Sequence, residues 1–178
     1  MKRTFSTKRL CRAGVIAALY VAITYAFMPF AFGPLQIRPA EALCILPLFF
    51  PEAVPALYVG CMLSNIASPF WLYDVFLGSL ATLLAALVTY MVGVFAKKDS
   101  FRIALGGIAP VILNAVIIPF IIVFLCDGVV DSASLTAAYF TYALSIFLTE
   151  LVWVYALGTP LYFGVKSMRK HGVSFLRN

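Results

Sequence analysis

The stretch AEALCILPLFFPEAVPALYVGCMLSNIASP, residues 40–69, decides the fold. It is apolar but interrupted by Pro47, Pro51, Pro55 and Pro69, and it holds more residues than one membrane crossing needs. Clear apolar segments lie on both sides of it, each long enough for a hydrocarbon core of about 30 Å. The helix count therefore depends on how often this middle stretch crosses.

The composition predicts that lipid is the main solvent of the chain. Of its 178 residues, 63% are hydrophobic and only 11% are charged, and the mean hydropathy is +1.02. Soluble domains carry about 25% charged residues. We therefore expect an integral protein of the cell membrane.

The basic residues predict the topology. Twelve of the thirteen Lys and Arg residues fall in three clusters: Lys2, Arg3, Lys8, Arg9 and Arg12; Lys97, Lys98 and Arg102; and Lys166, Arg169, Lys170 and Arg177. Long apolar stretches separate the clusters, as the positive-inside rule requires of cytoplasmic flanks, and this distribution does not fit a nucleic-acid-binding face. An even number of crossings must then join the first two clusters, so the middle stretch crosses twice and turns at residues 50–52.

These arguments predict an all-α, six-helix membrane protein with both termini in the cytoplasm. We expect one domain over 1–178, with a basic cytoplasmic N-terminus at 1–12, helices at 13–30, 40–50, 52–68, 74–96, 102–125 and 137–165, and a cytoplasmic tail at 166–178. Asp127 and Asp131 would lie in an exposed outer loop, and Asp99 in a solvated cytoplasmic one.

Polar residues inside the membrane are costly, so they are the first candidates for function. At 1.5 Å per residue, Asn114 lies roughly 17 Å from Ile103 and Glu150 roughly 20 Å from Ala137, so both are expected near the midplane. Four further residues fall at the outer helix ends and would form the mouth of a cavity: Arg38, Glu41, Asn65 and Asp74. There, Arg38 or water could satisfy the two acids.

Trp153 shares a helical face with Glu150, together with Ile146 and Leu157. A carboxylate beside an indole suits a flat heterocycle that donates hydrogen bonds. The alternative is that Trp153 is packing and Glu150 pairs with another helix. Glu52 lies at the predicted cytoplasmic turn, where it could simply cap the following helix.

The first helix carries a strip of small residues, with Ala13 and Ala17 spaced by four. Such strips allow two helices to approach closely, so a partner-docking surface is plausible beside the basic end. A single histidine and the absence of paired cysteines predict neither a metal site nor a cofactor.

One long stretch of the chain resembles the QueT family: FGPLQIRPAEALCILPLFFPEAVPALYVGCMLSNIASPFWLYDVFLGSLATLLAALVTY. The resemblance runs from about Arg12 to the end of the last helix, and Pro39 is a minor departure from it. Its most specific parts are Arg38-x-x-Glu41-Ala42, Pro51-Glu52-Ala53, and Asp74 followed by Gly78-Ser79-Leu80-Ala81-Thr82.

That resemblance implies a substrate-binding S-component of an energy-coupling factor (ECF) transporter for a queuosine precursor, a 7-deazaguanine. It also implies a membrane-embedded T-component, which Ala13 and Ala17 would meet, and two cytoplasmic ATPase subunits. No G-x-x-x-x-G-K-[ST] occurs in the chain, so ATP hydrolysis is expected in the partners. The alternatives are an S-component for riboflavin or thiamin and, with less support because catalytic motifs are lacking, an intramembrane enzyme.

Overall fold

The computed structural model describes residues 7–32, 36–126 and 134–173, and all regular structure in these ranges is helical. The all-α class is therefore confirmed. The elements are α1 (Thr7–Ala26), α2 (Met28–Ala31), η1 (Pro39–Leu48), α3 (Ala53–Asn65), α4 (Trp71–Tyr73), η2 (Asp74–Gly78), α5 (Ser79–Phe95), α6 (Asp99–Phe120), η3 (Ile121–Leu125), α7 (Leu135–Val152), η5 (Trp153–Leu157) and α8 (Gly158–Lys170). The predicted outer loop with Asp127 and Asp131 lies outside the described residues.

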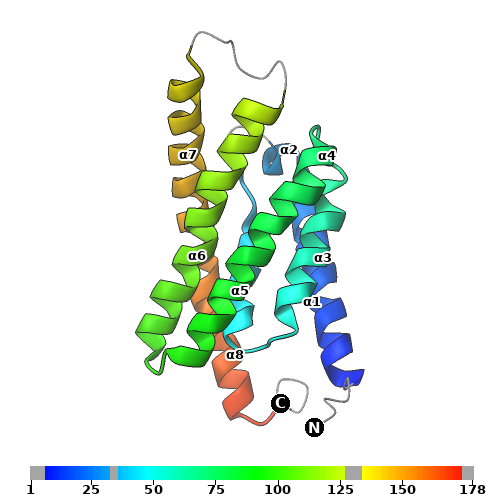
Figure 1. Ribbon diagram of the computed structural model, residues 1–178. Helices are drawn as coiled ribbons and strands as arrows, with labels where there is room; N and C mark the ends of the chain where they lie inside the picture. The colour runs from blue at the N-terminus through cyan, green and yellow to red at the C-terminus, as the bar shows by residue number, and fades with distance from the viewer. Residues whose placement is uncertain (1–6, 33–35, 127–133, 174–178) are drawn as a thin grey trace.

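Several elements join end to end, which leaves, besides the four-residue α2, six helical segments of ten or more residues in the described ranges. The elements η2, η3 and η5 are short π-helical stretches inside longer helices, whereas η1 is a 3₁₀ helix. Successive segments run in opposite directions (Figure 1). The start of α1, the turn between η1 and α3, the turn between α5 and α6, and the end of α8 consequently share the lower end of the bundle in Figure 1.

Four of the segments are long and apolar enough to cross a membrane: Thr7–Ala26, Trp71–Phe95, Asp99–Leu125 and Leu135–Lys170. The other two are short. Ten residues of 3₁₀ helix in η1 and thirteen residues of α-helix in α3 each rise about 20 Å, less than a hydrocarbon core of about 30 Å. The prediction of six membrane-spanning helices is therefore not confirmed, although six segments run along the bundle.

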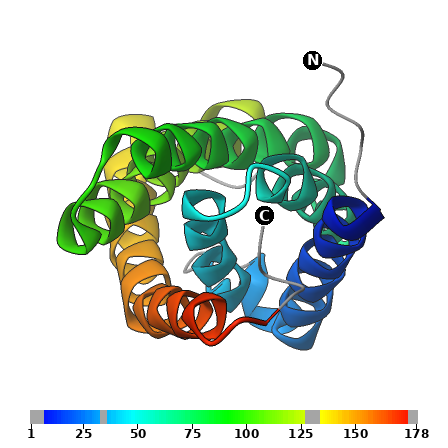
Figure 2. The same cartoon turned by 90° about the horizontal axis from the view of Figure 1, so that it is seen from below.

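The short helix η1 lies at the centre of the bundle. All ten of its residues are buried, and it contacts α1, α3, α5, α6, η5 and α8, which surround it in Figure 2. A helix that is apolar around most of its circumference lies either in a protein core or in lipid, and here other helices cover it. The helices α5 and η1 can approach closely because Gly93 of α5 has no side chain. A Cβ atom at that position would lie only 2.9 Å from the Cα atom of Leu48.

The ends of the first and last segments differ from the predicted ranges. The first helix begins at Thr7, so Lys8, Arg9 and Arg12 belong to α1 and not to an N-terminal flank. It ends at Ala26, and the short α2 follows with Pro29 in its first turn. The last segment continues to Lys170, inside the predicted tail. The first and last helices thus continue beyond their apolar parts into the basic segments of the sequence.

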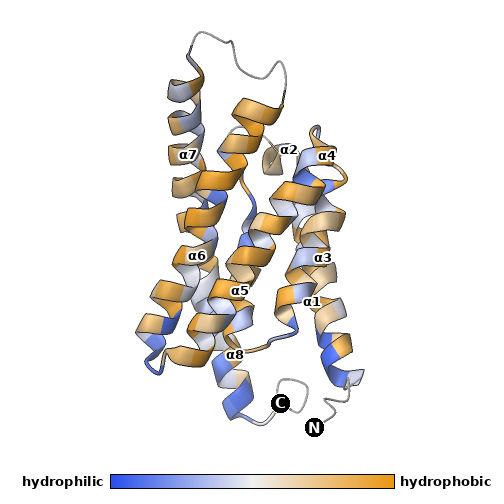
Figure 3. Cartoon of the chain, viewed as in Figure 1, coloured by the Kyte–Doolittle hydropathy of each residue, from blue (hydrophilic) through white to orange (hydrophobic). Residues whose placement is uncertain are grey.

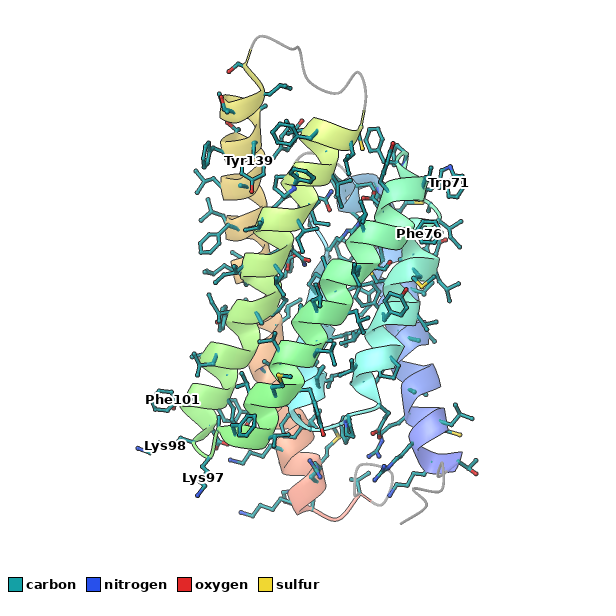
Figure 4. The ribbon with its side chains drawn as sticks, viewed as in Figure 1. Trp71, Phe76, Lys97, Lys98, Phe101 and Tyr139 are labelled. Carbon is teal, nitrogen blue, oxygen red and sulfur yellow. The ribbon has the colours of Figure 1, made fainter. Side chains whose placement is uncertain are left out.

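The long helices are mostly coloured as hydrophobic, and hydrophilic residues lie at the lower end and near α4 (Figure 3). Many large hydrophobic side chains are exposed on the bundle. Exposed aromatic rings occur toward both ends. Trp71, Phe76 and Tyr139 lie toward the upper end, and Phe101 lies beside Lys97 and Lys98 at the lower end (Figure 4). Aromatic rings near both ends of an apolar surface are typical of the two membrane interfaces.

Candidate functional site

The amide of Asn114 and the carboxylate of Glu150 form a buried pair between α6 and α7. The Nδ2 atom of Asn114 donates to Oε1 of Glu150 at 2.9 Å. Each residue follows the start of its helix by fifteen positions, or about 22 Å, so the two side chains meet at similar depth. The second carboxylate oxygen, Oε2, is buried and has no hydrogen-bond partner among the residues that the structure describes. An acceptor of this kind is available to a ligand that donates hydrogen bonds.

Glu41 of η1 belongs to the same polar interior. The Tyr20 hydroxyl of α1 donates to one of its oxygens, and Cys44 Sγ donates to the other at 3.1 Å. Residues three apart eclipse in a 3₁₀ helix, which places Cys44 beside Glu41. The hydrogen-bond partners of Glu41 are thus Tyr20 and Cys44, and not Arg38, one of the two partners that the sequence suggested.

Arg38, Asn65 and Asp74 form a second hydrogen-bonded group at the upper ends of their segments in Figure 1. Arg38 donates through Nη2 to Oδ1 of Asn65 at 3.1 Å and through Nε to the carbonyl of Ala31 at 3.0 Å. Asn65 in turn donates through Nδ2 to the backbone carbonyl of Asp74 at 2.7 Å. The Asp74 carboxylate accepts a hydrogen bond from Ser68. The structure therefore brings together three residues predicted at the cavity mouth, and Asp74 is satisfied by Ser68 instead of Arg38.

Trp153 is half-buried and lies three residues after Glu150, at the start of η5. Ile146, on the predicted shared face, is buried. Leu157, also predicted on that face, is 45% exposed. The π-helical turn explains the difference, because i→i+5 hydrogen bonding shifts the register that an α-helical spacing assumes.

The small-residue strip of the first helix lines a surface groove of about 530 Å³ between α1 and α3. Its walls are Arg9, Leu10, Ala13, Gly14 and Ala17 from the α1 side, and Pro51, Glu52, Pro55, Ala56 and Val59 from the α3 side. A Cβ added at Gly14 would meet no atom within 4 Å, so the groove is open there. None of the predicted substrate-binding residues lines it.

Three arginines from separate segments surround the Phe49-Phe50 turn at the lower end of the bundle. Arg12 lies over the Phe50 ring at 4.4 Å, Arg102 over the Phe49 ring at 5.5 Å, and Arg169 over both rings. The Glu52 carboxylate pairs with Arg12 at 2.5 Å. Although Glu52 is the N-cap residue of α3, its side chain makes no capping hydrogen bond.

Several of these residues were not singled out by the sequence. In the sequence, Tyr20, Cys44 and Ser68 are apolar or uncharged residues that did not stand out. Arg12 was assigned to the basic N-terminal flank. One signal was present: Arg12, Ile16, Tyr20 and Thr24 recur every four residues, and all four are buried on one face of α1. Asp99 was expected in a solvated loop but begins α6, where it accepts hydrogen bonds from Tyr162 and Lys166. Within the described ranges, no group of three or more His, Cys, Asp or Glu side chains could hold a metal ion.

Comparison with known proteins identifies the family. The family model described as QueT transporter matches residues 10–167, which is most of the chain. The queuosine precursor transporter QueT of Lactococcus lactis subsp. cremoris (strain MG1363) is 32% identical over 103 residues, covering 57% of this chain and 60% of that relative. The match thus spans less than two thirds of the relative's length. No solved structure matches the chain. With its long apolar helices and buried polar interior, this chain belongs to the QueT transporter family.

Proposed function

We propose that the chain is the substrate-binding subunit of an ATP-driven ECF importer that captures a queuosine precursor, queuine or another 7-substituted 7-deazaguanine, from outside the cell. Family membership and the name of the Lactococcus lactis relative support the transport function and the class of substrate. The four long apolar helices support a multi-pass location in the cell membrane.

The observation that carries this proposal is the unpartnered Oε2 atom of Glu150. The Watson–Crick edge of a deazaguanine presents two adjacent N–H donors, and a carboxylate accepts such a pair with geometric specificity. Asn114 holds Oε1 at 2.9 Å and so fixes the orientation of the carboxylate. Glu150 would therefore accept the two N–H groups, with Asn114 supplying a further polar contact.

Other buried residues have complementary roles in this proposal. Trp153, three residues from Glu150, would stack on the heterocycle. Glu41 would face the 7-substituent, because an aminomethyl ammonium group favours a second acid nearby. Arg38, Asn65 and Asp74 are 0–5% exposed and bonded together, so substrate entry from outside would require their hydrogen bonds to open.

The groove between α1 and α3 is proposed as the docking surface for the membrane-embedded T-component. The small side chains of Ala13 and Ala17 leave the groove open to close approach, and a bulky side chain there would hold a partner helix away. Two cytoplasmic ATPase subunits would bind that component. The basic residues at the lower end of the bundle favour a cytoplasmic location for both termini.

The test is uptake of labelled queuine by cells that express this chain with or without an energy-coupling module. Accumulation should require the chain, the module and ATP. An Arg38→Met variant serves as a comparison with Glu150→Gln, since Arg38 lies in the outer group. The proposed position of the site would be wrong if Arg38→Met abolished queuine binding while Glu150→Gln bound it as tightly as the parent.

A further inference from the structure

A second surface groove lies between α5 and α6 at the lower end of the bundle and has a volume of about 550 Å³. Its lining is mainly apolar: Val88, Met91, Val92, Phe95, Ala96, Lys97, Lys98, Phe101 and Leu105. Phe101 and the two lysines lie together where α5 turns into α6 (Figure 4). The proposed substrate site and the proposed docking surface leave this groove unused.

The groove is short and ends at two positive charges. From Val88 to Phe95 it follows α5 for eight residues, or about 12 Å. This is less than half of a hydrocarbon core of about 30 Å, so the groove stays within one leaflet. An acyl chain of a lipid needs only one leaflet.

The two lysines keep their positive charge available. Both are exposed, and neither forms an ion pair with an acid of the described residues. The nearest acid in sequence, Asp99, is already paired with Lys166 and hydrogen-bonded to Tyr162. The groove between α1 and α3 differs, since it contains Glu52 as well as Arg9. The α5–α6 groove therefore combines apolar walls with an uncompensated basic mouth.

We propose that this groove is a binding site for an anionic phospholipid of the cytoplasmic leaflet. Lys97 and Lys98 bind the phosphate of the headgroup, and one acyl chain lies along Met91, Phe95 and Leu105. Anionic lipids concentrate in the cytoplasmic leaflet, and basic pockets between helices on that side bind their headgroups. The assignment of the leaflet rests on the orientation proposed above.

The test is native mass spectrometry of the full chain in detergent, titrated with phosphatidylglycerol or phosphatidylcholine. The parent should bind phosphatidylglycerol more tightly, and Lys97→Gln/Lys98→Gln should remove about thirtyfold of that preference, since each basic residue near a membrane surface contributes about one kcal/mol. The preference of the parent should also fall as salt is raised.

Two further variants separate this site from general surface charge and from a protein interface. Lys8→Gln/Lys170→Gln removes the same charge at the same end, away from the groove, and should keep the preference. Met91→Trp fills the groove from an exposed position and should weaken binding of phosphatidylglycerol. Equal binding of both lipids by the parent, or equal loss in the two lysine variants, would overturn the proposal. So would a Met91→Trp variant that binds phosphatidylglycerol normally but no longer co-purifies with its membrane partner.

Discussion

Replacing Glu150 with Gln separates a binding role from a structural one. A binding role predicts weaker ligand affinity with unchanged or higher stability, whereas a structural role predicts lower stability with unchanged affinity. The Gln oxygen can still accept the 2.9 Å hydrogen bond from Asn114, so the contact between α6 and α7 remains. The unpartnered Oε2 atom becomes an NH₂ donor facing the N–H donors of the ligand. A hydrogen bond to a charged group contributes about 1.5 to 3 kcal/mol, so deazaguanine binding should weaken by about ten- to a hundredfold.

The same change should leave the ligand-free protein at least as stable as the parent. A neutral amide costs less to bury than a carboxylate with an unpaired oxygen. Isothermal titration calorimetry measures the affinity, and a thermal melt in detergent measures the stability. Asp99→Asn is the matched control, because that acid lies at the start of α6 and pairs with Lys166, far along the helix from Asn114. The reasoning is refuted if Glu150→Gln lowers the melting temperature and keeps full affinity, since Glu150 is then a structural residue.

Three other predictions address docking, packing and topology. Ala17→Trp should abolish uptake and co-purification with the membrane partner but keep ligand binding. Ala18→Trp, on the exposed side of α1, should keep all three properties. Loss of ligand binding in Ala17→Trp would indicate that Ala17 packs inside the protein. Gly93→Leu should lower the free energy of unfolding by about 1 to 3 kcal/mol because its Cβ meets the Leu48 backbone, and an unchanged melting temperature would contradict that close contact. Cys11, which is exposed, should react with a membrane-impermeant maleimide only after the cells are permeabilised; labelling of intact cells would place the start of α1 outside.

The sequence predicted the helical class and the course of the middle stretch, but not its geometry. Charge parity predicted that residues 40–69 cross the membrane twice; η1 and α3 do run up and down the bundle, but two full crossings are not confirmed. The 3₁₀ conformation of η1 and its complete enclosure depend on contacts with six other elements, and a single sequence does not show those contacts. The π-helical turn at Trp153 likewise moved Leu157 away from the expected face.

The buried polar residues could be named from sequence because an acid or amide in an apolar helix is conspicuous. Their partners could not, since pairing depends on tertiary contacts. Depth along the helices placed Asn114 and Glu150 at a similar level, and the structure adds the hydrogen bond between them. For Glu41, the partners Tyr20 and Cys44 carry polar atoms on otherwise apolar or neutral side chains, so the sequence offered Arg38 instead.

The most direct test of the central claim is a ligand-shift thermal melt of the purified chain with queuine, 7-cyano- and 7-aminomethyl-7-deazaguanine, guanine, riboflavin and thiamin. A ligand that binds only the folded state at a hundred times its Kd stabilises that state by about 2.7 kcal/mol. We expect at least one deazaguanine to raise the melting temperature, and riboflavin and thiamin to leave it unchanged. A rise with riboflavin or thiamin and none with any deazaguanine would contradict the proposed substrate.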